Sequence, residues 1–136
     1  MKYTIEDLRE AETKELDVTQ FFPKAKEPVI ITIKRLNSRQ HARYFNFIAL
    51  AQFEITQAKA DGIPLDQVDL SGWDAARMET LLGGVIQDDK LPFEKWDKET
   101  IEAVDKRDSA LVSFIYDGIQ ELGRPLAKKK NSGSEK

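Results

Sequence analysis

Residues 37–60 carry the feature that most constrains this chain, a long helical pattern with two apolar faces. Asn37 or Ser38 can cap its start, because a short oxygen-bearing side chain accepts from the free N–H groups of the first turn. Gly62 followed by Pro64 ends the pattern. The sequence therefore predicts a helix over residues 38–61, about six turns long.

At about 100° per residue, the first apolar face is an ordinary core-facing stripe. It consists of Tyr44, Phe47, Ile48, Ala51, Ile55 and Ala58. A second ridge recurs at i, i+3, i+7 and i+11, and it consists of Ala42, Phe45, Ala49 and Phe53. Either both faces are covered within the domain, or the second is kept for another protein, because soluble monomers seldom leave a continuous apolar ridge in water. The pattern alone favours burial of both.

The rest of the pattern predicts a mainly α (α+β) fold, with three to four helices and a short N-terminal β-hairpin. Residues 16–22 and 29–36 are rich in β-branched and aromatic side chains, which suit a strand, and Pro23 and Pro28 bracket the connection between them. We therefore expect a hairpin over residues 16–36. Because two strands alone are marginal in water, we expect the long helix to cover them.

Three more helices are expected, the first a short one over residues 5–13 with a thin apolar stripe. The second spans residues 71–83, where Ser71 and Asp74 match a capping box, and the third spans residues 97–122, with Asp97 as its cap. Asp108 falls within the apolar face of the third helix. A buried charge there needs a partner, so we expect an ion pair or hydrogen bond to an Arg or Tyr, with a functional carboxylate as the alternative.

Length and composition indicate one globular domain over residues 1–125 and a disordered polar tail over residues 126–136. The chain has 136 residues, 40% of them hydrophobic, which suffices for a core without staples. The absence of cysteine excludes disulfides and thiolate chemistry. No apolar run approaches the roughly 18 residues of a membrane span, and the N-terminal segment is polar, so we expect a cytoplasmic protein without membrane contact.

No motif points to catalysis, a cofactor or a metal site, so we expect a protein that is not an enzyme. His41 is the sole histidine, and the GxGxxG, P-loop and HExxH patterns do not occur. The net charge of −3 gives no general attraction to phosphate backbones, so nucleic acid is not an expected partner. The local exception is a small basic cluster of Arg35, Arg39, His41 and Arg43, which we interpret as a solvated helix start.

A second candidate surface lies in the extended or looped segment around Pro92, where Leu91, Phe93 and Trp96 stand close together. With the ridge of Ala42, Phe45, Ala49 and Phe53, these residues are the candidate partner-binding set. For each of them, packing in the core is the competing interpretation.

Four stretches occur in an order and with a local sequence that resemble a known protein family. They are VIITIKRLNSRQHARY leading into the long helix, GGVIQDDKLPFEKWDKETIEAV, DSALVSFIYDGIQEL and the polar ending KKKNS. This layout resembles the tail assembly chaperones of long-tailed bacteriophages and related prophages.

The resemblance implies a small cytoplasmic protein of the bacterial host that is absent from the mature virion. Such a protein binds the tape-measure protein, keeps it soluble and helps to recruit tail-tube subunits during tail assembly. Formation of a homo-oligomer stays open. The alternatives are a structural subunit of the virion, such as a head–tail connector or tail terminator, and a small host protein-interaction domain.

Overall fold

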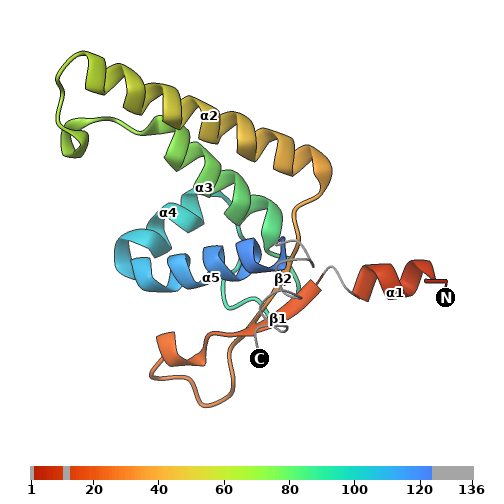
Figure 1. Cartoon of the computed structure of the whole chain (residues 1–136). Coiled ribbons are helices and arrows are strands. Elements are labelled where there is room, and N and C mark those ends of the chain that lie inside the picture. The colour runs from red at the N-terminus through yellow and green to blue at the C-terminus, as the bar shows by residue number, and fades with distance from the viewer. Residues whose placement is uncertain (1, 11–12, 124–136) are drawn as a thin grey trace, which may run out of the picture.

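The computed structural model describes residues 2–10 and 13–123, and the predicted tail, residues 126–136, lies outside them. The elements are α1 (Ile5–Glu10), β1 (Thr13–Asp17), the 3-10 turn η1 (Thr19–Phe21), β2 (Ile30–Lys34), α2 (Ser38–Ala60), the 3-10 turn η2 (Leu65–Gln67), α3 (Ser71–Gly84), α4 (Lys98–Arg107) and α5 (Ser109–Leu122) (Figure 1). The mainly helical α+β fold with an N-terminal hairpin is confirmed. The described residues form five helices, however, where three to four were expected.

The hairpin is antiparallel, with Thr13 opposite Lys34 and Asp17 opposite Ile30. Its first strand starts and ends earlier than the predicted range 16–22. The Asp17 carboxylate accepts hydrogen bonds from the backbone N–H of Thr19 at 2.9 Å and from its hydroxyl at 2.6 Å. This local turn competes with the strand ladder and starts η1, so β1 ends at Asp17.

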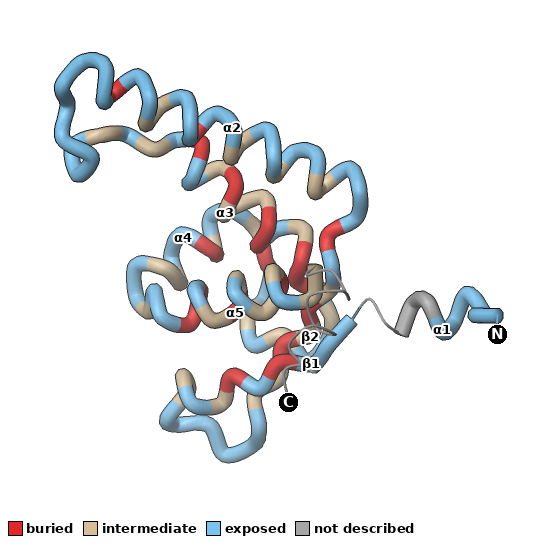
Figure 2. The backbone as a smooth tube through the Cα atoms, viewed as in Figure 1, coloured by how far each residue is buried: buried red, intermediate tan, exposed pale blue. Residues whose placement is uncertain are grey.

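The core lies where α3, α4 and α5 pack with the hairpin (Figure 2). It consists of Leu16, Val18, Ile31, Ile33, Leu36, Leu81, Val85, Trp96, Ile101, Leu111, Val112, Ile115 and Ile119. The long helix α2 contributes none of these residues, so the prediction that it covers the hairpin is wrong. Instead α5 covers the hairpin, because its four buried branched side chains form a continuous apolar face.

The predicted helix over residues 97–122 is two helices, because Asp108 interrupts it. Asp108 has a non-helical backbone (φ −150°, ψ 82°), donates its N–H to the Val104 carbonyl at 2.7 Å and accepts from the Leu111 N–H at 3.3 Å. It therefore ends α4 and caps α5. The predicted pairing of a buried Asp108 with an Arg or Tyr is wrong, since this half-buried carboxylate bonds to a helix N-terminus.

The long helix α2 packs along α3, outside the core (Figure 1). The predicted core-facing stripe is confirmed: Ala51 and Ala58 are buried, and Tyr44, Phe47, Ile48 and Ile55 are half-buried. The start of α3 lies very close to α2, since a Cβ added at Gly72 would stand 2.4 Å from the backbone nitrogen of Ala51. Only glycine fits at this contact.

In the parts of the chain that the structure describes, no helix combines the length and the apolar character that crossing a membrane requires.

Candidate functional site

The ends of α2 are fixed by local hydrogen bonds that its sequence provides. The Asn37 side chain accepts from the Gln40 N–H, and the Gln40 side chain accepts from the Asn37 N–H, both at 2.9 Å. This capping box confirms the predicted start. At the other end Gly62 adopts φ +71°, a conformation that glycine enters without strain, so the helix stops where predicted.

Two charged side chains of α2, Glu54 and Arg43, bind residues of α3. The Glu54 carboxylate accepts from the Ser71 hydroxyl at 2.7 Å and from the Gly72 N–H at 2.8 Å, and the Ser71 hydrogen bond is the main reason why the pKa of Glu54 is lowered. Arg43 donates to Glu79 at 2.9 Å. Ser71 thus bonds to α2, and the predicted capping box with Asp74 is wrong.

The second apolar ridge faces solvent. Phe45 is 61% exposed and Phe53 is 64% exposed. Ala49, between them, and Ala42, before Phe45, are exposed as well. The buried and half-buried residues of α2 belong to the stripe that packs along α3, and most of the remaining residues of this helix are exposed (pale blue in Figure 2). The interpretation that both apolar faces of this helix are buried within the domain is therefore wrong.

The ridge is the middle of a longer surface, here called the outer face of α2. Nine exposed residues form it: Ser38, Ala42, Phe45, Asn46, Ala49, Gln52, Phe53, Thr56 and Ala60. None of them is charged, although 33% of the chain is charged. At 1.5 Å per residue, this face runs for roughly 33 Å. An uncharged strip of this length with two exposed phenylalanines is typical of a binding surface.

Phe45 is held in place by neighbouring rings. The Tyr44 ring meets it edge-on at 5.5 Å between centroids, and the His41 ring stacks on it at 6.1 Å. His41 is thus a packing residue of the helix start. Beside Phe45 a hollow of about 300 Å³ opens between the start of α2 and the end of α5, and Leu36 and Ile119 contribute to its lining. An apolar side chain of a partner can enter here next to Phe45.

The second predicted surface is not exposed. Trp96 is only 3% exposed, and its indole N–H donates to the Leu81 carbonyl at 2.8 Å. The Phe93 ring packs against the Trp96 ring in a tilted arrangement, with 5.5 Å between the centroids, and both Leu91 and Phe93 are half-buried against the core. The expectation that Leu91, Phe93 and Trp96 form an exposed aromatic cluster is therefore wrong, because the loop folds its apolar side chains inward.

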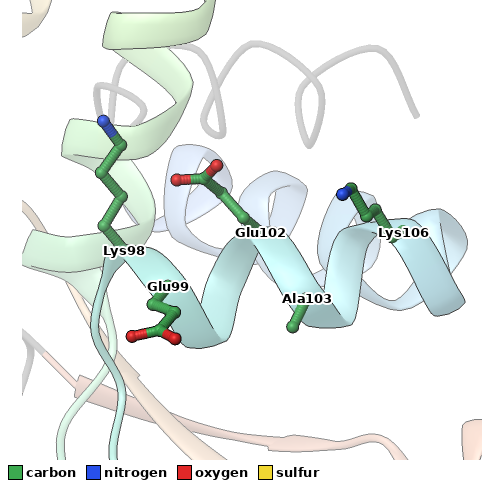
Figure 3. A pocket seen from close by; sticks show the side chains of 5 residues that line it. All are labelled: Lys98, Glu99, Glu102, Ala103 and Lys106. Atoms are coloured by element: carbon green, nitrogen blue, oxygen red, sulfur yellow. The ribbon is translucent and has the colours of Figure 1, made fainter.

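Other surfaces offer weaker sites. An open hollow of about 560 Å³ lies on α4. Figure 3 shows the side chains that line it: Lys98, Glu102 and Lys106 project to one side of the helix, and Glu99 and Ala103 to the other. The charges alternate in sign along this helix, as is typical of a solvated face. Within residues 2–10 and 13–123, no three His, Asp or Glu side chains are grouped so that they could hold a metal ion.

The apolar periodicity of residues 37–60 predicts the ridge but not the full length of the outer face. Thr56 and Ala60 continue it beyond Phe53, and Ser38 precedes it. The signal was the absence of charge at these spacings, which a search for large apolar residues alone does not detect.

Comparisons with models of protein families, with curated protein sequences and with solved structures find no match for this chain. The function must therefore be inferred from the outer face of α2 and from the resemblance in sequence layout.

Proposed function

We propose that this protein is a tail assembly chaperone that binds a phage tape-measure protein through the outer face of α2 and keeps it soluble. The observation that supports this most strongly is the exposure of Phe45 and Phe53 on an uncharged strip of about six helical turns. The resemblance in sequence layout supplies the identity of the client.

The outer face of α2 and a helical client have surfaces of complementary shape. A tape-measure protein is a long helical chain with apolar stripes, and an apolar helix face pairs with such a stripe by side-chain interdigitation. Phe45 and Phe53 stand eight positions apart, which is two helical turns and roughly 80° more, so the two rings lie on either side of the Ala49 line and can pack against both sides of a client helix. Shielding of the client needs no bond-making chemistry.

Several copies of the chaperone on one client can bind with high overall affinity even though each single interface is weak. One helix face of this size makes a small interface, which favours weak and reversible binding. Repeated contacts along the same chain raise the overall affinity through effective concentration. Subunits of the tail tube can then displace the chaperone copy by copy, and the protein stays in the host cytoplasm.

Co-expression with a candidate tape-measure protein tests the proposal. We expect the tape-measure protein to be insoluble alone, and to become soluble and co-purify when this chain is present. A tape-measure protein that stays in the pellet at equal expression would contradict the chaperone role.

Purified phage particles distinguish the chaperone from a structural subunit of the virion. A chaperone should be depleted from particles, whereas a connector or terminator subunit should be present in a fixed ratio to the other tail proteins. Quantitative mass spectrometry of particles and of the infected lysate measures this ratio.

A further inference from the structure

The outer face of α2 is nearly symmetric in sequence about Ala49. Phenylalanines stand four positions before and after it, at Phe45 and Phe53, and carboxamides stand three positions before and after it, at Asn46 and Gln52. Farther out, the small residues Ala42 and Thr56 lie at seven positions, and Ser38 and Ala60 lie at eleven. All nine are exposed.

A strip that repeats itself in reverse fits a two-fold interface, because every pair of facing residues is then alike in size and polarity. In an isologous dimer the same patch meets itself, so each residue must fit the residue at the mirrored position. From this symmetry we infer that the outer face of α2 pairs antiparallel with the α2 of a second copy, with the two-fold axis at Ala49.

The geometry of the pairing follows from helix dimensions. Ala49 meets Ala49 of the second copy, and its small side chain permits close approach of the helices. Phe45 then lies at the same level as Phe53 of the second copy. Four positions in a helix turn the side chain by about 40° past a full turn, so Phe45 and Phe53 lie on opposite sides of the Ala49 line and pack side by side.

The charge distribution favours a second copy over a charged partner. The chain has a net charge of −3, so a surface for self-association must avoid contacts between like charges. The nine residues of the outer face carry none. Of the charged groups beside it, Arg43 and Glu54 are engaged with α3. Arg39 and Lys59, ten positions before and after Ala49, lie on opposite edges of the face, so the antiparallel pairing keeps them on opposite sides of the interface.

The size of the interface sets the expected strength. One helix pair lies at the small end of specific interfaces, so we expect a dimer populated at protein concentrations of about 0.1–0.5 mM. The pairing does not depend on the chaperone role. It would cover the phenylalanines when no other partner is bound.

Single-cysteine variants test the register, because the chain has no cysteine of its own. A disulfide needs Cα atoms roughly 4.4–6.8 Å apart, so Ala49→Cys should cross-link with itself under mild oxidation much faster than Ala103→Cys, an exposed position on α4. Ala42→Cys should not cross-link with itself, because its two copies would lie roughly 21 Å apart along the axis. Mixed with Thr56→Cys, it should form the heterodimer.

Sedimentation equilibrium of the wild-type protein and of Phe45→Ser/Phe53→Ser completes the test. The wild type should dimerise in the stated range, and the double variant should bind itself at least about tenfold more weakly. A wild-type protein that stays monomeric up to about 0.5 mM would overturn the inference. So would self-linking of Ala42→Cys at the rate of Ala49→Cys, which indicates a parallel arrangement. Neither result bears on binding of the tape-measure protein, which co-expression measures separately.

Discussion

Gly72 is the residue that fixes the distance between α2 and α3. A Cβ at this position would lie 2.4 Å from the Ala51 nitrogen and 2.5 Å from the Phe47 carbonyl oxygen, and both are backbone atoms that cannot rotate away. We therefore expect Gly72→Ala to lower the free energy of unfolding by about 1–3 kcal/mol, even though alanine favours helices. Urea unfolding followed by circular dichroism measures the difference.

Gly123→Ala is the matched control, because a Cβ there would meet its nearest neighbours at ordinary contact distances of 3.5–3.6 Å. It should leave the stability nearly unchanged. Equal stability of the Gly72→Ala variant and the wild type would show that α2 and α3 are not packed this closely.

The raised pKa of Tyr116 predicts that the free energy of unfolding decreases in alkaline solution. Burial, together with a 3.4 Å contact between its hydroxyl and that of Tyr44, raises the pKa of Tyr116 above the ordinary 10.0. The unfolded chain then releases this proton at lower pH than the folded chain does. The contribution of the protonated Tyr116 hydroxyl to the free energy of unfolding is fully present below about pH 10 and is lost as the pH rises above that value.

Urea unfolding between about pH 8 and pH 11 measures this effect. Tyr116→Phe has no proton to release, so its stability should decline less steeply than that of the wild type over this range. Parallel declines in the two proteins would refute the role assigned to Tyr116.

Residues such as Trp96 show what sequence cannot reveal at this scale. An aromatic cluster beside a proline in a polar loop has the composition of an exposed patch. Its burial depends on the Leu81 carbonyl, fifteen positions earlier in the chain, which accepts the indole N–H. Periodicity within one segment holds no information on such a partner.

At the scale of elements, α2 combines a face that stabilises the fold with a face that does not. We expect Phe45→Ser/Phe53→Ser to change the free energy of unfolding by no more than about 1 kcal/mol, because exposed substitutions cost about 0.5 kcal/mol or less each and serine and phenylalanine have similar helix propensities. Urea unfolding at low protein concentration, where self-association is absent, measures this change.

Ile115→Ala is the contrasting variant, because Ile115 is fully buried in the core. It should cost about 2–5 kcal/mol. A comparable loss in the double phenylalanine variant would mean that the ridge is part of the core.

Element boundaries were predictable where a local signal sets them. Asn37, Gly62 and Asp97 act at the helix ends as their sequence positions predicted, since capping depends on neighbours within four residues. The shifted strand β1 and the break between α4 and α5 were missed. In both places an aspartate competes for backbone N–H groups, and whether it does so depends on the surrounding packing.

At the scale of the whole molecule, the core forms without α2. We predicted that the long helix covers the hairpin because the two are neighbours in the chain. In the structure, α5 covers the hairpin. The greater apolar content of the α5 face, with Leu111, Val112, Ile115 and Ile119, was visible in the sequence. The sequence does not reveal that α5, which is distant in the chain, packs on the hairpin in place of the neighbouring helix α2.

Within residues 2–10 and 13–123, this arrangement leaves one side of α2 exposed along the length of the helix, which is why we assign function to that side. The central claim is that Phe45 and Phe53 serve association with a helical partner and contribute little to folding. Variants that remove both rings, and a control that removes an equally exposed apolar side chain elsewhere, separate these roles.

The decisive measurement is the amount of soluble tape-measure protein on co-expression with the wild type, with Phe45→Ser/Phe53→Ser and with Leu65→Ser. Leu65 is 58% exposed and lies in η2, away from the outer face. Our account predicts that the wild type and Leu65→Ser keep the client soluble, whereas the folded double variant leaves most of it in the pellet. Equal solubility of the client with all three proteins would contradict the central claim.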